Sequence, residues 1–440
     1  MTGISPTKLL PVLLGSAIAA GGLLQGLHWK RTAAAGDTAA MEEQLRLATE
    51  ENAALKRENE SLRSLAQGGG EFAVPQEFIA RVEKELGLDF LSNPVVHRIA
   101  PEELRDRIGA AVESRFGPAG IDDRQEAYTL LGCLNAGHVL LEETTAALSV
   151  GARGWFDDVT GEAWVTERFR IEDIPDQAAL VSLLTRILLH QHFPPPPAYP
   201  GDDADRARQA LHQGTAAGAE SRYLAASARE AGFVPMKQDA EVARTFASLS
   251  PFVRGLLLFP GTTGKGFADA LFVKGRDPLL AAFRNPPQTT RGIMEPGAPP
   301  AAPKPPELPP VLPDGAAETD YLTETTGQLA LRLWLEAGEG GESARETAKH
   351  WSGDRYRLFP AGESALALIW EIEMDAAPAA DALEKLMLAR ITAMAGIGSD
   401  AVMDTPLATR DGRHLLLSRP SPTRLRFLNT ADPATALKWK

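Results

Sequence analysis

The amino-terminal part of the chain contains an apolar stretch that is long enough to cross a membrane. Residues 9–27 carry no charged side chain, and Lys8 and the sequence HWKR (28–31) flank them. At about 1.5 Å per residue, a helix of this length spans a hydrocarbon core of about 30 Å. A cleaved signal peptide is the alternative, because the small residues TAAAG (32–36) follow. We expect a short tail (1–8) and a retained signal anchor that crosses the inner membrane once, with the bulk of the chain facing the periplasm or exterior.

A heptad pattern follows in residues 36–66. Apolar side chains and two asparagines recur there at 4-3 spacing, at Met41, Leu45, Ala48, Asn52, Leu55, Asn59 and Leu62. A buried asparagine in such a seam favours one register and the dimeric state, so the pattern predicts a short parallel coiled coil and a homodimer. A single solvated helix is the alternative. The glycine-rich segment 67–71 is expected to act as a flexible joint.

From residue 72 to residue 440 the pattern is that of a folded domain in which helices dominate. Apolar positions with helical spacing predict helices over 75–87, 100–117, 123–136, 177–192 and 203–230. The segment GWFDDVTGEAWVTE (154–167) differs, because a DVTG turn separates two aromatic, β-prone runs. It predicts a hairpin.

The carboxy-terminal third mixes strands with helices. Strand-like runs cover 364–374, 413–420 and 423–429, and helical patterns cover 326–337 and 378–395. By composition the proline-rich run 296–313 resembles an interdomain linker, but we expect it to be a surface loop inside one domain. Together these patterns predict an α+β fold.

Charge and cysteine content exclude several classes of function. The formal net charge of −13 argues against a general nucleic-acid-binding protein, which needs a basic face to neutralise phosphates. The single cysteine, Cys133, excludes an intrachain disulfide framework and a cysteine zinc cluster. Its apolar neighbours favour a buried, unreactive thiol.

Six short motifs follow one another in the globular part of the chain. They are GWFDDVTGEAWV (154–165), SLLTRILLHQHF (182–193), QGTA (213–216), FPGTTGKGFA (259–268), PPQTTRGIMEP (286–296) and HWSGDRY (350–356). In this order they resemble a bacterial branch of the gluzincin-type HExxH zinc metallopeptidases. That branch has a hairpin GFYDPxTGxLYV, a helix HExxHALQDQHF and a second helix with EGDA. The resemblance implies a mainly helical, zincin-like fold for residues 72–440.

The resemblance also implies where zinc would bind, and the residues needed for catalysis are missing there. In the family, two histidines one helical turn apart and a carboxylate from a second helix hold the metal, while a glutamate activates its water. The five HExxH positions here are Ser182, Leu183, Leu184, Thr185 and Arg186. The third ligand position is Gln213. Leucine accepts no proton and arginine brings a positive charge to the metal position, so we expect no catalytic residue, metal or cofactor.

The residues around these positions have also changed. A family tyrosine corresponds to Gly261 and a late family histidine corresponds to Glu295. His192 matches a family position that is not a zinc ligand, and we expect it to be hydrogen-bonded near the end of its helix. We expect these three residues and the degenerate zinc positions to line a cleft that accepts a peptide or protein partner.

The sequence therefore predicts a pseudopeptidase rather than an enzyme. It would be a membrane-anchored, catalytically inactive protein that acts as a binding or scaffolding module at the cell envelope. One alternative is an active metal-dependent hydrolase with rearranged ligands such as His190, His212 or Glu220. His190 and His192 are two residues apart and do not share a helix face, which disfavours an ordinary two-histidine site. The other alternative is a purely architectural envelope protein whose cleft is filled by side chains.

Two other motifs are interpreted as structural. PGTTGKGF (260–267) lacks the glycine and the hydroxyl residue that a phosphate-binding loop needs at its ends. Glu371 and Glu373 lie on one side of a predicted strand, a spacing that is typical of a solvated face.

Overall fold

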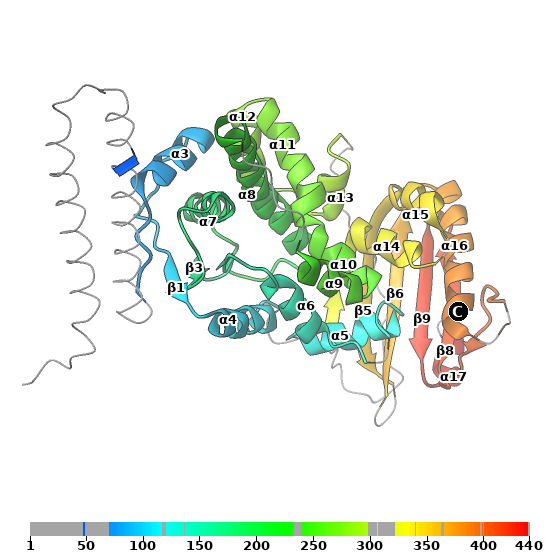
Figure 1. The fold of residues 1–440 in the computed structure, drawn as a ribbon. Helices are drawn as coiled ribbons and strands as arrows, with labels where there is room; N and C mark the ends of the chain where they lie inside the picture. Colours follow the sequence, from blue (N-terminus) through cyan, green and yellow to red (C-terminus); the bar gives the residue numbers. More distant parts are fainter. Residues whose placement is uncertain are drawn as a thin grey trace, which may run out of the picture. The chain divides into compact units, whose positions relative to one another are not determined.

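The structure is a computed structural model of residues 1–440 (Figure 1). It describes residues 47–48, 70–116, 120–135, 137–232, 239–297, 306, 322–338, 340–361, 365–396, 398 and 400–438. The predicted membrane segment, nearly all of the predicted coiled coil and most of the proline-rich run lie outside the described residues. Within the described part of the chain, no helix combines the length and the apolarity that a membrane crossing requires. Residues Val74–Lys440 form one compact unit, and Met1–Ala73 form a second unit.

The first half of the larger unit is mainly helical. Its helices are α3 (Gln76–Leu86), α4 (Pro101–Ser114), α5 (Gly120–Leu130), α6 (Leu140–Ser149), α7 (Ile174–His192) and α8 (Asp202–Ala231). All five helices expected in this half are present. The predicted third helix, 123–136, ends earlier than expected, because Gly132 has a left-handed φ of 69° that an α-helix cannot continue through.

A small sheet accompanies these helices. It contains β1 (His97–Ile99), β2 (Gly154–Phe156) and β3 (Ala163–Thr166), in the order β1-β3-β2. Strands β2 and β3 pair antiparallel, with Gly154 opposite Val165, so the predicted hairpin is confirmed. Strand β1 adds to β3 in parallel. Strand β2 packs against α7, and Asp158 in the hairpin turn accepts a hydrogen bond from Arg186 of that helix.

Helices α7 and α8 form the centre of this half. Most of α7 is buried, in agreement with its apolar sequence. Helix α8 also crosses a short π-helix, η4 (Pro260–Gly264), at a pair of glycines. A Cβ atom on Gly214 would lie 2.3 Å from the carbonyl carbon of Gly264, so only glycine allows this crossing.

The chain then continues through a run of short helices. They are α9 (Ala240–Ser248), α10 (Pro251–Leu258), α11 (Lys265–Val273), α12 (Arg276–Arg284) and α13 (Thr290–Met294). Three of them begin at side-chain caps. Asp239 accepts a hydrogen bond from the Glu241 amide, Ser250 accepts one from the Val253 amide, and Thr289 accepts one from the Gly292 amide. PGTTGKGF thus forms part of a π-helix and an α-helix rather than a phosphate-binding loop.

The second half is built around a larger sheet. Its described strands are β4 (Leu322–Glu324), β5 (Trp351–Pro360), β6 (Leu366–Met374), β7 (Leu407–Ala408), β8 (His414–Ser421) and β9 (Arg424–Thr430), in the order β4-β5-β6-β9-β8-β7. All neighbouring strands are antiparallel. The described helices are α14 (Gly327–Glu336), α15 (Gly341–Ala348), α16 (Ala377–Ala395) and α17 (Pro433–Lys438). The strands and helices expected here are present, and the fold is α+β.

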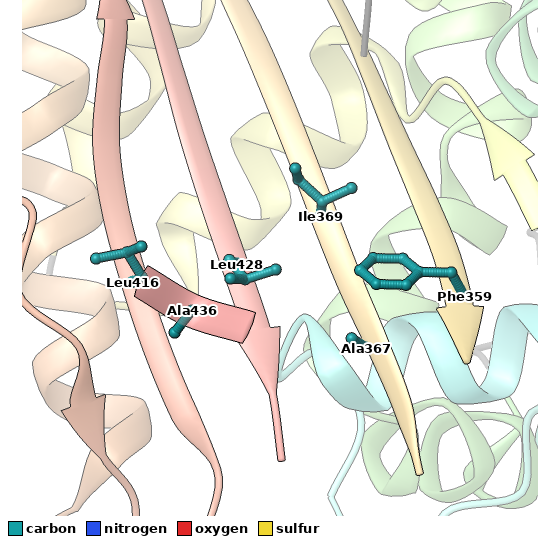
Figure 2. Packing of buried hydrophobic residues seen from close by; sticks show 6 residues of the cluster. All are labelled: Phe359, Ala367, Ile369, Leu416, Leu428 and Ala436. Carbon is teal, nitrogen blue, oxygen red and sulfur yellow. The ribbon is translucent and has the colours of Figure 1, made fainter. Parts of the chain in front are cut away.

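The two faces of this sheet have different neighbours. Helices α14 and α16 pack on one face, where Trp334 of α14 meets Trp370 of β6 edge to face at 5.4 Å between ring centroids. On the other face, a cluster of apolar side chains joins four strands to α17 (Figure 2). This cluster contains Phe359, Ala367, Ile369, Leu416, Leu428 and Ala436.

The prediction that Glu371 faces solvent is wrong. Its side chain is fully buried, and Arg426, its cross-strand neighbour on β9, donates to Oε1 through Nε at 2.7 Å. Arg424 lies 3.6 Å from the other oxygen. Alternation along a strand identifies the face but not what covers it, and here long arginine side chains of β9 cover the carboxylate.

Buried polar contacts join the second half to the first. The Trp334 indole donates to the carbonyl oxygen of Leu131 at 2.6 Å, and the Asn429 amide donates to that of Leu130 at 2.7 Å.

Asp354 of the GDRY motif accepts five hydrogen bonds within the second half. The donors are the Thr326 amide and hydroxyl, the Gly327 amide and the indoles of Trp351 and Trp370. The motif is therefore a structural junction between α14 and the sheet.

Candidate functional site

The position expected to hold the second zinc ligand carries a guanidinium that is bound from two sides. Arg186 of α7 donates through one terminal nitrogen to the carbonyl oxygen of Phe156 at 3.1 Å and to Oδ1 of Asp158 at 2.9 Å. The guanidinium also lies over the Phe156 ring, 4.9 Å from its centroid. Arg186 thus places a positive charge where the resemblance implies a zinc ion.

Asp158 is the buried anion of this centre. Burial alone would raise the pKa of its carboxyl group, but Arg186 and the more distant Arg115 and Arg208 hold that pKa well below the usual range. Asp158 is therefore ionised at neutral pH and acts only as a hydrogen-bond acceptor. We call Arg186, Asp158 and Gln213 the Asp158 cluster.

Gln213, at the position expected for the third zinc ligand, binds the same aspartate. Its amide nitrogen donates to Oδ2 of Asp158 at 3.3 Å. One turn earlier on α8, Gln209 donates to Oδ2 of Asp205 at 2.7 Å. Burial again opposes ionisation of Asp205, but Arg115 lowers its pKa through a two-bond ion pair of 2.8 and 3.1 Å.

The other two degenerate positions have separate surroundings. Leu183, at the position of the general base, is buried, and its Cδ1 atom lies close to Gly154 of the hairpin. Ser182, at the position of the first ligand, hydrogen-bonds to Glu220 of α8, whose pKa burial raises. The structure therefore brings Arg186 and Gln213 together through Asp158, whereas Ser182 faces Glu220, two turns further along α8.

A cavity of about 140 Å³ lies beside the Asp158 cluster. It is bounded by helices α4, α5, α6, α8 and α10 and by the hairpin. Its apolar wall includes Val112, Phe116, Leu148, Trp155, Val159, Leu256 and Leu257. Its polar wall includes Asp158, Gln213, Gln209 and the ion pairs Arg115–Asp205 and Arg124–Asp202. Of the degenerate positions only Gln213 lines the cavity, so the open space is displaced from the expected centre toward α4 and α6.

The remaining predicted cleft residues lie elsewhere. At the end of α7, the ring of His192 is 2.8 Å from the carbonyl oxygen of Asp89. Gly261 is exposed within η4, and Glu295 caps the end of α13. None of these three residues lines the cavity.

The two histidines proposed as rearranged ligands, His190 and His212, each pack against a phenylalanine ring. His212 is buried with its ring edge to face against Phe283 at 4.9 Å, and burial lowers its pKa to about 3. Burial also lowers the pKa of His190, whose ring packs against Phe156 at 5.6 Å and close to Gly161. Among the described residues, no three His, Cys, Asp or Glu side chains are arranged so that they could hold a metal ion.

Sequence reasoning missed Asp158, although a signal was present. The hairpin of the family has a proline where this chain has Asp158, and its helix has a histidine where this chain has Arg186. Considered separately, each residue is a departure from the family pattern. Together they form a largely buried ion pair between positions that are 28 apart in the sequence.

The chain was compared with family models, curated proteins and solved structures, and no match was found in any of the three.

Proposed function

We propose that this protein is a membrane-anchored, catalytically inactive relative of the gluzincin-type metallopeptidases, with a zincin-like fold that serves as a binding or scaffolding module at the cell envelope. The observation that carries the proposal is the ion pair between Arg186 and Asp158. The expected metal position is occupied by a guanidinium with two acceptors of its own. A cation that approached this point would meet a like charge, which is unfavourable in a buried environment.

The neighbouring positions support the same interpretation. Gln213 is neutral and uses its amide nitrogen on Asp158, and Leu183 has no group that could transfer a proton. The cavity beside the cluster favours a binding module over a purely architectural protein, because an architectural core would be expected to fill this space with side chains.

An active hydrolase with rearranged ligands is less well supported. The ring of His212 is buried edge to face against Phe283, and the positive charges of Arg208 and Arg186 lie near it, which disfavours a bound metal cation. Glu220 is engaged by Ser182. Zinc analysis of the purified full chain tests the two functions against each other. We expect no stoichiometric zinc and no hydrolysis of peptide substrates, and one zinc per chain would refute the proposal.

Restoring the family residues should create a zinc site. We expect the quadruple variant Ser182→His, Leu183→Glu, Arg186→His and Gln213→Glu to bind about one zinc ion per chain, because two histidines one turn apart and a facing carboxylate form the ligand set of such sites. Metal content is measured after dialysis, and circular dichroism verifies folding. Glu102→His with Asp106→His, an exposed pair on α4 with the same spacing, controls for adventitious binding. A folded quadruple variant that takes up no more zinc than this control would contradict the implied alignment.

The amino-terminal segments make a separate prediction. A chain that begins at residue 36 should form dimers in sedimentation experiments, whereas a chain that begins at residue 72 should be monomeric, because only the first contains the heptad seam.

Mass spectrometry of the mature amino terminus tests whether residues 9–27 are retained as a membrane anchor. A start near residue 36 would show cleavage instead of retention.

A further inference from the structure

We propose that the cavity along α8 binds an extended, uncharged peptide segment, with one bulky apolar side chain in the cavity and two main-chain N–H groups donating to Gln209 and Gln213. This inference rests on the proposed binding function and specifies the chemistry of the ligand. It follows from the orientation of the two glutamine amides, from the cavity wall and from the charges that surround it.

The two glutamines have fixed orientations. Asp158 and Asp205 are ionised carboxylates, so each can only accept hydrogen bonds. The amide nitrogens of Gln213 and Gln209 must therefore face them, as the distances of 3.3 and 2.7 Å show. The carbonyl oxygens consequently point away from the aspartates. Within the described part of the chain, neither oxygen has a hydrogen-bond partner, and both glutamines line the cavity.

The spacing of these acceptors suits an extended main chain. Residues four apart on a helix have Cβ atoms about 5–6 Å apart. In an extended peptide, N–H groups on the same side recur every two residues, at about 6.6 Å. Two successive outward N–H groups can therefore reach Gln209 and Gln213 together.

The rest of the cavity favours an apolar side chain of moderate size. Its volume of about 140 Å³ is close to that of an engineered apolar cavity of roughly 150 Å³ that holds benzene. Val159, which lines the cavity, is one of the large apolar side chains that remain exposed, at 55%.

Two ion pairs in the wall disfavour a charged ligand. Arg115 is paired with Asp205, and Arg124 is paired with Asp202 at 2.6 Å with both side chains almost fully buried. A carboxylate or ammonium group entering the cavity would have to compete with these pairs. An uncharged peptide segment leaves them intact.

Calorimetric titration of the full chain with capped tripeptides tests the proposal. The probes are acetyl-Ala-Leu-Ala-methylamide, the same peptide with lysine at the centre, and an ester analogue in which one main-chain N–H is replaced by oxygen. We expect the leucine peptide to bind, the lysine peptide to bind at least about 10-fold more weakly, and the ester to lose about 3- to 10-fold, the equivalent of one hydrogen bond. Gln213→Met should cause a similar loss, whereas Gln288→Met, an exposed glutamine outside this cavity, should have no effect.

A steric variant locates the bound peptide. Ala111 lines the cavity and its neighbour Ala110 is exposed outside it, so Ala111→Phe should abolish binding and Ala110→Phe should preserve it. Equal affinities for the peptide and the ester, or unchanged binding by Ala111→Phe, would overturn the proposal. No binding of any probe by a chain that is free of zinc and hydrolytic activity would also overturn it, while the inactive-enzyme proposal would remain intact. Zinc binding with hydrolysis would instead refute the proposed function itself.

Discussion

Replacing Arg186 with methionine should lower the free energy of unfolding by about 3–5 kcal/mol at pH 7, because the substitution leaves Asp158 as a buried charge without its nearest partner. Methionine keeps much of the volume of the side chain, so the loss of the ion pair dominates the effect. Urea unfolding of the two proteins measures the difference. Arg105→Met, an exposed substitution on α4, should change stability by less than about 0.5 kcal/mol.

The pH dependence identifies the aspartate as the cause. Asp158 has a folded-state pKa below its unfolded value of about 3.9, so its contribution to stability is present above that value and is lost as pH falls through the folded pKa. The defect of Arg186→Met should therefore be largest near neutral pH and smaller in acid. Adding Asp158→Asn to Arg186→Met should restore part of the lost stability, because the buried charge is then absent. If the double variant were less stable than Arg186→Met at pH 7, the buried charge could not be the cause.

Much of the fold could be predicted from the sequence, because its elements follow local patterns. The apolar runs of α7 and β6, the turn of the β2–β3 hairpin and the alternation along β9 each depend on residues that are close together in the chain. Strand β5 was not predicted as a strand. Gly353 and Asp354 interrupt its apolar alternation, and they stand there because Asp354 accepts hydrogen bonds from α14 and from two tryptophans.

The candidate site was less predictable, because its contacts join residues that are distant in the sequence. The resemblance led us to expect that Arg186 and Gln213 do not bind zinc, but it did not indicate that both would bind Asp158 of the hairpin. Similarly, strand alternation placed Glu371 on the correct side of the strand but did not reveal the arginines of β9 that bury it. A buried charge needs a partner, yet the sequence does not identify which partner it finds.

A second cavity, of about 380 Å³, lies at the start of α8, and a carboxyl group in its wall has a strongly shifted pKa. Asp203 belongs to its wall and is almost fully buried. One oxygen of Asp203 accepts hydrogen bonds from the Thr290 amide and hydroxyl, at 3.0 and 2.6 Å. The other oxygen is buried without a hydrogen-bond partner among the described residues. Burial raises the pKa of Asp203 to about 7.

This raised pKa predicts that Asp203→Asn changes the pH dependence of stability. The folded protein holds a proton on Asp203 up to about pH 7, whereas the unfolded chain releases it near pH 3.9. The protonated Asp203 therefore contributes stability in acid, and this contribution is lost as pH rises between these two values. Each pH unit in this window corresponds to about 1.4 kcal/mol. The unfolding free energy of Asp203→Asn minus that of the natural chain should therefore rise by about 3 kcal/mol from pH 4.5 to pH 7.

The prediction concerns a change in the stability difference with pH, so it does not depend on how well the asparagine side chain packs. An asparagine can keep the two hydrogen bonds from Thr290 through its carbonyl oxygen, and any steric penalty of its amide group is the same at both pH values. Urea unfolding at several pH values gives the difference, and Asp106→Asn, at an exposed position on α4, should show no such gain. If the stability difference between Asp203→Asn and the natural chain stayed constant from pH 4.5 to pH 7, Asp203 would have to be ionised in the folded protein throughout that range. Its unpartnered oxygen would then need a cation, because an isolated carboxylate in a buried environment is too unfavourable to persist.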